Sequence, residues 1–199
     1  MFFDGTGRVH QTMRRIADEF EKAGIRYAIM GGMAVNAHRH ERTTKDVDFL
    51  LSADGFLAFQ RLLDVIDVER VPGHPRRFID RTTAVRFDVL ITGLFPGSGA
   101  PGPIAFPEPQ QSSIIIENLH VVDLKNLIEL KLAARRHQDF ADVVNLIRAN
   151  QLDPSFAANL HPSVQGDYIE CLEEMRREDQ YELRQDQAWE ERRKRESGQ

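Results

Sequence analysis

Hydrophobic residues recur along this chain with two different periods. Spacings of three and four residues predict amphipathic helices from residue 9 to about Gly24, over 33–40 and 53–67, from residue 123 onward, and over about 139–149. Period-two alternation or short apolar runs predict strands over 26–30, 46–51, 77–80 and 84–92, and a hairpin of 113–116 with 119–122. Helices and strands are intermixed, which predicts an α+β fold with a small mixed β-sheet flanked by helices.

Two segments interrupt this pattern. Residues 93–109 contain five prolines and four glycines, so we expect a long loop, which in a compact domain is usually functional or mobile. Residues 165–195 form a long charged segment without a continuous apolar seam, which predicts a C-terminal helical extension that docks only in part.

Asp46 and Asp48, at the start of strand 46–51, are the first candidates for chemistry. Because side chains alternate between the two faces of a strand, both carboxylates project from the same face. Carboxylates this close repel each other, and a divalent cation such as Mg²⁺ or Mn²⁺ would offset that repulsion. The pattern is equally compatible with one aspartate in a turn and the other solvated at a sheet edge.

Two further features could extend this site. Gly31 and Gly32 stand between a predicted strand and a predicted helix, where glycine lets a phosphate approach the backbone, although a simple tight turn would also explain them. Asp88 lies on strand 84–92, on the face opposite its hydrophobic residues. Three carboxylates on adjacent strands can bind two divalent ions for in-line phosphoryl displacement, with Asp88 as the general base.

The sequence at these positions resembles the DNA polymerase β-type nucleotidyltransferase superfamily. The resemblance rests on MGGMA at 30–34, RTTKDVDFL at 42–50 and RFDVL at 86–90. The segment LKLAAR at 130–135, followed by Asp139 and Asp142, is similar to the AbiEii-type branch, which includes toxins of bacterial toxin–antitoxin and abortive-infection systems. The resemblance covers roughly residues 10–150 and implies the nucleotidyltransferase fold.

The resemblance also implies a role for each site residue. Gly31 and Gly32 would bind the triphosphate, and Asp46, Asp48 and Asp88 would be the metal ligands, Asp88 acting also as base. Lys131 would contact the nucleotide phosphates, and Asp142, with Asp139, would complete the pocket. Taken alone, Lys131 is better explained as a solvated helix-face lysine, and Asp139 is equally a helix cap.

Other residues carry weaker signals. Many superfamily members have serine at the position of Gly32, so this glycine argues against a routine aminoglycoside-modifying enzyme. His38 and His40 flank Arg39 near Arg42, where a phosphate or acceptor contact is one interpretation. The arginines within residues 76–86 either bind nucleic acid or are ordinary surface side chains; they are Arg76, Arg77, Arg81 and Arg86.

Composition narrows the class of protein. The chain of 199 residues is 41% hydrophobic and 29% charged, and its net charge of −5 does not indicate wholesale nucleic-acid binding. No apolar run is long enough for a membrane span, and the N-terminus lacks the pattern of a secretory signal. The single cysteine, Cys171, excludes an internal disulfide and a cysteine-based zinc cluster, so we expect a cytoplasmic protein.

We therefore predict a Mg²⁺-dependent nucleotidyltransferase that moves an NMP from an NTP to an acceptor hydroxyl. The acceptor is a tRNA, a protein or a small molecule, and the resemblance adds a toxin role and a cognate antitoxin. The alternative is a non-catalytic protein that keeps the fold and binds nucleotide or a partner. Three parts are expected: a catalytic domain at 1–118, a helical subdomain at 119–164 that completes the nucleotide pocket, and a charged helix at 165–199.

Overall fold

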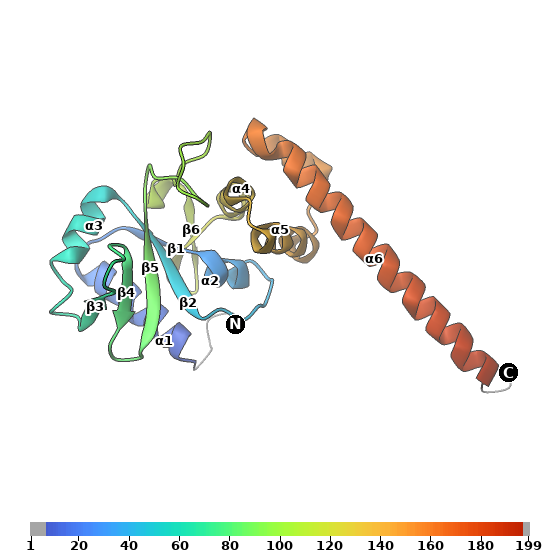
Figure 1. Cartoon of the computed structure of the whole chain (residues 1–199), viewed down its shortest axis with the longest axis horizontal. Helices are drawn as coiled ribbons and strands as arrows, with labels where there is room; N and C mark the ends of the chain where they lie inside the picture. The colour runs from blue at the N-terminus through green and yellow to red at the C-terminus, as the bar shows by residue number, and fades with distance from the viewer. Residues whose placement is uncertain (1–6, 197–199) are drawn as a thin grey trace.

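The computed structural model describes residues 7–196 and shows a mixed sheet flanked by helices (Figure 1). The N-terminal segment in which a secretory signal was sought lies largely outside these residues. The strands are β1 (Tyr27–Met30), β2 (Asp46–Leu51), β3 (Val68–Arg70), β4 (Arg77–Asp80), β5 (Val85–Ile91), β6 (Ser113–Ile116) and β7 (Leu119–Val122). The helices are α1 (Arg8–Lys22), α2 (Gly31–Ala37), α3 (Ala53–Gln60), α4 (Leu124–Ala134), α5 (His137–Asn150) and α6 (Pro162–Glu196), with short 3-10 turns η1 (Pro109–Gln111) and η2 (Pro154–Asn159).

The seven strands form a single sheet in the order β3-β4-β5-β2-β1-β7-β6. The pairs β2–β5 and β1–β7 are parallel, and the other neighbouring strands are antiparallel. The expected α+β class, the mixed sheet and the C-terminal helical extension are confirmed. The sheet includes β7, which lies beyond residue 118, where the predicted catalytic domain ends. The division of the chain into three functional parts stays a prediction.

One face of the sheet is covered by α1 and α3 through an aromatic cluster. Phe49 of β2 and Phe87 of β5 point to this face, where Phe20 of α1 and Phe59 of α3 pack against them with ring centroids 5.2–6.0 Å apart. All four rings are fully buried, and burying an aromatic ring of this size contributes about 2–3 kcal/mol. Because side chains alternate along each strand, this packing turns Asp48 and Asp88 to the opposite face.

Most predicted elements are present, but two helices differ from the prediction. The helix expected over 53–67 ends at Gln60, and turns then lead to β3, a strand that was not predicted. Asp67 has a positive φ of 53°, so the chain reverses there instead of continuing as helix. The helix expected over 33–40 begins two residues earlier, at Gly31, and ends at Ala37.

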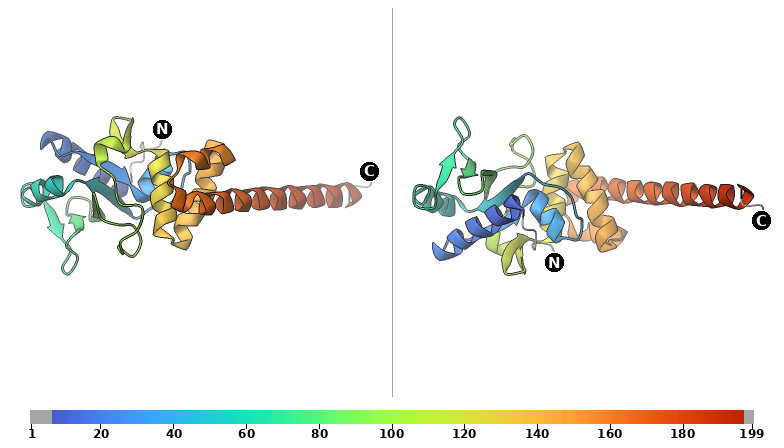
Figure 2. Two further views of the ribbon diagram at one scale, coloured as in Figure 1. Left: turned by 90° about the horizontal axis from the view of Figure 1, so that it is seen from above. Right: turned by 90° about the horizontal axis from the view of Figure 1, so that it is seen from below.

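The C-terminal helix α6 is docked at its start and exposed along the rest of its length (Figures 1 and 2). Tyr168 is fully buried, its ring lies 5.7 Å from that of Phe156 in η2, and its hydroxyl donates to the Asp153 carbonyl at 2.9 Å. Arg148 of α5 holds Glu178 and Asp179 at 2.7 and 2.9 Å, beyond which the described side chains of α6 are exposed. Partial docking of this helix is therefore confirmed. No helix within residues 7–196 is both long and apolar enough to cross a membrane.

Candidate functional site

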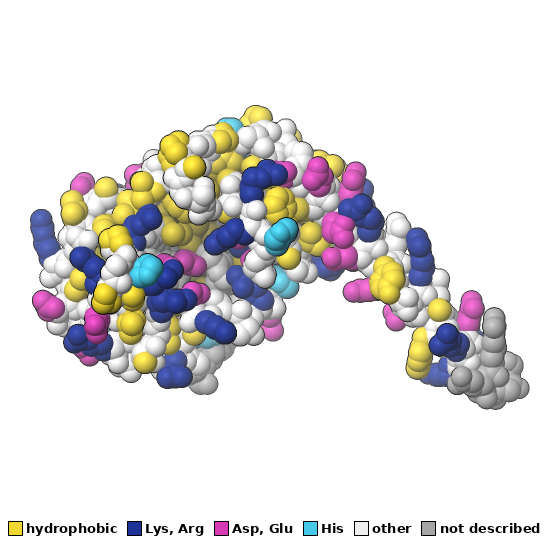
Figure 3. Space-filling model, in the orientation of Figure 1, with side chains coloured by type: hydrophobic (Ala, Val, Ile, Leu, Met, Phe, Trp, Pro, Cys, Tyr) yellow, Lys and Arg dark blue, Asp and Glu magenta, His cyan; other side chains and the backbone are white. Residues whose placement is uncertain are grey.

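A cavity of about 290 Å³ lies between the open face of the sheet and α4. The loop after β5 forms one rim through residues 95–99, and α4 forms the opposite wall. Figure 3 shows acidic side chains in the middle of the body with Lys and Arg side chains around them. The residues lining the cavity include Gly31, Asp48, Asp88, Lys131, Arg136 and Asp139. Five of the sequence-predicted site residues, Arg136 not being one of them, are thus brought to one place.

Asp46, Asp48 and Asp88, here called the acidic cluster, are positioned by strands β2 and β5. Parallel pairing places Asp48 directly beside Asp88, and Asp46 lies two residues earlier on the face that Asp48 shares. Asp48 has no hydrogen-bond or ion-pair partner among the described residues. Burial, followed by repulsion from Asp46 and Asp88, raises the pKa of Asp48 to about 7.

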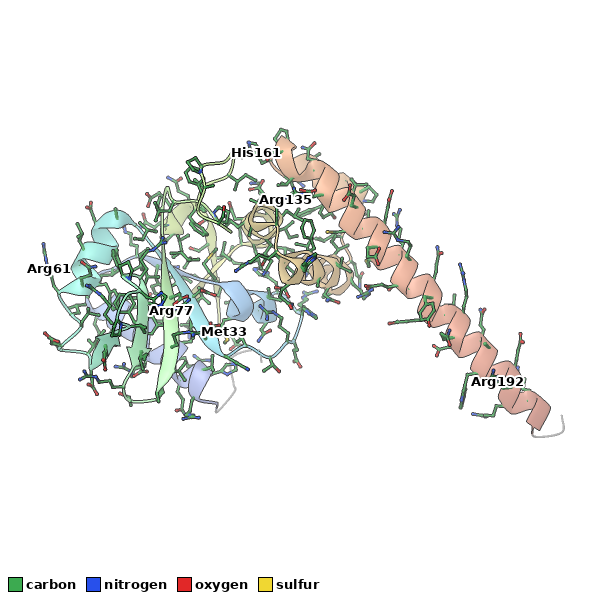
Figure 4. All side chains as sticks on the ribbon, in the orientation of Figure 1. Met33, Arg61, Arg77, Arg135, His161 and Arg192 are labelled. Carbon is green, nitrogen blue, oxygen red and sulfur yellow. The ribbon has the colours of Figure 1, made fainter. Side chains whose placement is uncertain are left out.

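The other two acids are held by arginines for which the sequence left two interpretations open, nucleic-acid binding or ordinary surface side chains. Arg77 of β4, labelled in Figure 4, lies over the middle of the sheet. It donates from Nε and Nη2 to the two oxygens of Asp88, each at 2.8 Å. Arg86 donates from Nη2 to Asp46 at 3.1 Å. Both pairs depend on the register between neighbouring strands, β4 with β5 for Arg77 and β2 with β5 for Arg86, which spacing within one strand does not indicate.

The glycine pair has a steric requirement at each position. Gly31 adopts a φ of +59°, and a Cβ there would lie 1.9 Å from Oδ2 of Asp48. A Cβ on Gly32 would lie 2.8 Å from the Thr44 hydroxyl oxygen. The backbone therefore approaches the acidic cluster more closely than any residue with a side chain would allow. Gly31 is already the first residue of α2, so the pair is more than a simple tight turn.

Lys131 belongs to a second group of charges, the α4–α5 cluster, formed by Lys131, Asp139 and Asp142. Its ammonium donates to Asp139 at 3.2 Å and to Asp142 at 2.6 Å, and its side chain is only 8% exposed. The interpretation of Lys131 as a solvated lysine is therefore wrong. Asp139 is not a cap either, because Arg136 is the N-cap residue of α5 and donates from Nε to Asp139 at 2.6 Å.

The α4–α5 cluster is tied to the segment before β2. Asp142 is almost fully buried, with the Arg42 guanidinium at 3.1 Å and the Gln138 amide donating to it at 3.1 Å. Asp142 therefore contacts the Lys131 ammonium without lining the cavity itself. Arg136, whose side chain is 71% exposed and lies at the cavity, was not predicted from the sequence. Arg76 was noted there only as one of a group of arginines, and it also lines the cavity.

Neither nearby histidine takes part in the site. His38 is buried and its Nε2 lies 2.7 Å from the Val122 carbonyl oxygen, to which it donates. Burial lowers the pKa of His38 and of His40, so both favour the neutral form at pH 7. His38 is therefore a structural residue, and a phosphate contact by His38 is not supported by this geometry.

The donor set suits a hard divalent cation, because carboxylate oxygens are the ligands that Mg²⁺ prefers. Asp48 supports this fit, since its pKa is raised beside two other acids and it forms no ion pair with a described lysine or arginine. Within residues 7–196, however, no three acidic, histidine or cysteine side chains stand close enough together to hold a metal ion. Two of the three acids are instead engaged by arginines. The metal triad stays a prediction.

Comparisons with known proteins give structural likeness only. No family model matches the chain, and no curated protein sequence matches it significantly. Among solved structures, ANT(2")-Ia in complex with adenylyl-2"-tobramycin has a TM-score of 0.44 and 13% identity, over 92% of this chain and 97% of that chain. The lincomycin-bound lincosamide antibiotic adenylyltransferase LnuA has a TM-score of 0.47 and 18% identity, over 68% and 94%.

A third similar structure is an antigenic nucleotidyltransferase-like protein from Paracoccidioides brasiliensis, with a TM-score of 0.45 and 18% identity over 79% of this chain and 91% of that chain. Likeness at this level assigns neither a family nor an activity to the chain.

Proposed function

We propose that the protein is a nucleotidyltransferase that moves an NMP from an NTP to an acceptor hydroxyl and releases pyrophosphate. One observation carries this proposal: Gly31, Asp48, Asp88 and Lys131 come from four separate elements and line one cavity. A site for nucleotidyl transfer needs close backbone approach for phosphates, carboxylates for divalent cations and a cation near the triphosphate. These four residues supply all three.

Asp46, Asp48 and Asp88 would hold Mg²⁺ or Mn²⁺ once the carboxylates of Asp46 and Asp88 turn away from Arg86 and Arg77. When bound, a divalent cation supplies positive charge for the triphosphate and favours ionisation of the attacking hydroxyl. Asp48 would be the shared ligand, since it lies between Asp46 on its own strand and Asp88 on the next. The position of Asp48 against the Gly31 backbone would keep its carboxylate next to the bound phosphates.

The triphosphate would lie between the glycine pair and α4. Gly31 and Gly32 leave the backbone free of side-chain bulk, and Arg136 is the exposed cation on the far side of the cavity. Lys131 lines the same cavity while held by Asp139 and Asp142, which fixes where its ammonium points. We propose that Lys131 and Arg136 contact the phosphates and that Asp142, with Asp139, positions Lys131.

The transfer step follows from this arrangement. The acceptor oxygen forms a bond to the α-phosphorus, and the bond from that phosphorus to the oxygen bridging to the β-phosphate breaks. Asp88 takes the proton of the acceptor hydroxyl, and the electron pair of the broken bond leaves with pyrophosphate. Asp88 lies at the cavity and is 24% exposed as a side chain, so an acceptor can reach it.

The choice of acceptor and the physiological role are further proposals. The AbiEii-type motif at residues 130–142 supports a toxin with a cognate antitoxin and a tRNA acceptor. The names of two similar structures mention tobramycin and lincomycin, so both compounds belong in an acceptor panel. The alternative function, a non-catalytic protein that binds nucleotide or a partner, is favoured by the arginine pairs on Asp46 and Asp88, which would satisfy these acids in a site without metal.

The experiment that separates the two functions is an assay with each α-labelled NTP, Mg²⁺, and a panel of tRNA, cell protein, tobramycin and lincomycin. A nucleotidyltransferase transfers label to at least one acceptor, and the Asp46→Asn and Asp88→Asn variants transfer none. Label on no acceptor, with NTP binding still measurable, would support the non-catalytic alternative. A gene for a small antitoxin next to this one would support the toxin role.

A further inference from the structure

The contact between Arg77 and Asp88 is the strongest ion pair of the acidic cluster. The two residues stand directly opposite each other in the antiparallel pairing of β4 with β5. Two parallel hydrogen bonds of 2.8 Å occupy both carboxylate oxygens of Asp88. The side chains of Arg77 and Asp88 are 34% and 24% exposed, so water only partly competes for them. Bidentate arginine–carboxylate pairs of this kind are stronger and more directional than single contacts.

The oxygens that Arg77 occupies are the ones a divalent cation at the acidic cluster would need. We propose that Arg77 is the positioning residue of Asp88: it holds the carboxylate when no cation is bound and releases it when one binds. Arg77 thereby sets the affinity of the acidic cluster for divalent cations. This inference rests on the metal-binding part of the proposed function and not on nucleotidyl transfer itself.

Arg77 is better suited to this role than Arg86, the other arginine of the cluster. Arg86 makes one hydrogen bond of 3.1 Å to Asp46, and its side chain is 47% exposed. The pKa of Arg77 is raised first by its hydrogen bonds and charge contact with Asp88, and additionally by the charges of Asp46 and Asp48. Arg77 therefore experiences the field of all three acids, whereas Arg86 acts as a weak contact at the edge.

The space needed for release lies on the outer side of the pair. A hollow of about 190 Å³ borders Asp88 on this side and is lined by His74, Arg76 and Arg77. Arg77 is the first residue of β4 and follows a turn in which Gly73 has a φ of +75°. His74 and Arg76 are exposed, so this hollow offers the guanidinium room beside Asp88. A positively charged Arg77 would also be repelled by a cation that enters between Asp48 and Asp88.

The test is the affinity for Mn²⁺ alone, measured by isothermal titration calorimetry in the absence of nucleotide. Arg77→Gln is expected to tighten Mn²⁺ binding about tenfold, because neither the charge nor the two hydrogen bonds compete with the metal. Arg77→Lys, which keeps the charge and loses the two-pronged geometry, is expected to tighten it by about threefold. Arg81→Gln is the matched control, since Arg81 pairs with Glu69 outside the acidic cluster, and should leave the affinity unchanged.

A second background tests whether Arg77 acts through Asp88. In Asp88→Asn protein, Arg77→Gln is expected to change the Mn²⁺ affinity by less than about twofold, because the carboxylate it would free is absent. An equal tightening in both backgrounds, an unchanged or weaker affinity of Arg77→Gln, or no Mn²⁺ binding by any variant would overturn the proposal. If Arg77→Gln does not fold by circular dichroism, the Arg77→Lys comparison decides. Mn²⁺ affinities as expected, with no transfer to any acceptor, would contradict only the proposed transferase activity.

Discussion

Two groups of charges meet at the same cavity and are balanced in opposite ways. In the α4–α5 cluster, Lys131 has two carboxylate partners, and both acids have further contacts with arginine. In the acidic cluster, three carboxylates gather and Asp48 has no partner within the described chain. One group is complete within the protein, whereas the other is short of positive charge.

The difference separates a structural requirement from a functional one. Fully paired buried charges cost desolvation free energy but recover it through short hydrogen bonds, so removing one partner is expensive. A carboxylate whose ionised form is disfavoured lowers the stability of the fold and is retained where a ligand will compensate it. We therefore expect substitutions in the two clusters to change different quantities.

The largest expected effect is on activity. Asp46→Asn or Asp88→Asn should reduce NMP transfer by at least about a thousandfold, equivalent to about 4 kcal/mol of transition-state stabilisation, because a ligand of the proposed metal site is lost. The initial rate with a saturating NTP measures it, and circular dichroism checks the fold. Asp186→Asn, on the exposed part of α6, is the control and should be fully active. Activity of Asp88→Asn equal to wild type would contradict the catalytic assignment.

The next effect is on stability and comes from the α4–α5 cluster. Asp142→Ala should lower the free energy of unfolding by about 3 kcal/mol, because it leaves the buried Lys131 ammonium and the Arg42 guanidinium with one fewer carboxylate. Urea unfolding followed by circular dichroism measures the loss. The matched control is Asp167→Ala, whose partner Arg135 is 64% exposed, and its cost should stay below about 1 kcal/mol. Equal losses for the two variants would show that the α4–α5 cluster is not a structural unit.

A smaller effect of opposite sign is expected for Asp48→Asn. The pKa of Asp48 is raised from 3.8 to about 7 in the fold, so the native state binds more protons than the unfolded state between these values. Wild-type stability therefore falls as pH rises through this window. Without divalent cations, Asp48→Asn should be more stable than wild type by about 2 kcal/mol at pH 8, after allowance for solvent screening, and by almost nothing at pH 4.

Urea unfolding in EDTA at pH 4.5, 6 and 8 follows this difference. A gap between Asp48→Asn and wild type that does not widen with pH would refute the origin of the effect in the ionisation of Asp48. Asp186→Asn, which changes the net charge by the same amount on exposed helix, corrects for the general effect of charge.

The smallest effect is expected outside both clusters. Ending the chain after Arg184 removes only exposed described side chains, including Trp189 with Arg193 over its ring at 5.3 Å. The contacts of Arg148 with Glu178 and Asp179 remain, so the free energy of unfolding should change by less than about 0.5 kcal/mol. A larger loss in urea unfolding would mean that the end of α6 stabilises the body.

Local patterns were sufficient to predict most of the sheet. The alternation around Phe87 and the run after Asp46 identified β5 and β2. The helix expected from residue 123 onward is α4, and Asp123 caps it by accepting from the Asn126 amide. Strand β3 was missed because it has only three residues and one buried side chain. The range predicted for helix α3, 53–67, was too long, because the apolar residues after Gln60 keep a helical spacing although the chain turns there.

The site was harder to predict because its contacts are long-range. The acids and glycines were found from spacing and resemblance, whereas the roles of Arg77 and Arg86 depend on which residues stand opposite them in neighbouring strands. The burial of Lys131 depends on how α5 packs against α4, and no pattern within α4 indicates it. Sequence periodicity shows which face a side chain occupies, but not which partner it meets there.

The parallel pairing of β2 with β5 also has a consequence for the time at which the site forms. Forty residues separate Asp48 from Asp88, although the two stand side by side in the sheet. During synthesis, Asp48 therefore waits about 2–8 s for its neighbour to be added, and longer for it to leave the ribosome. Because non-local pairing is slow, the three acids approach one another only as the central sheet closes. The nascent chain thus carries no assembled acidic site before its core is in place.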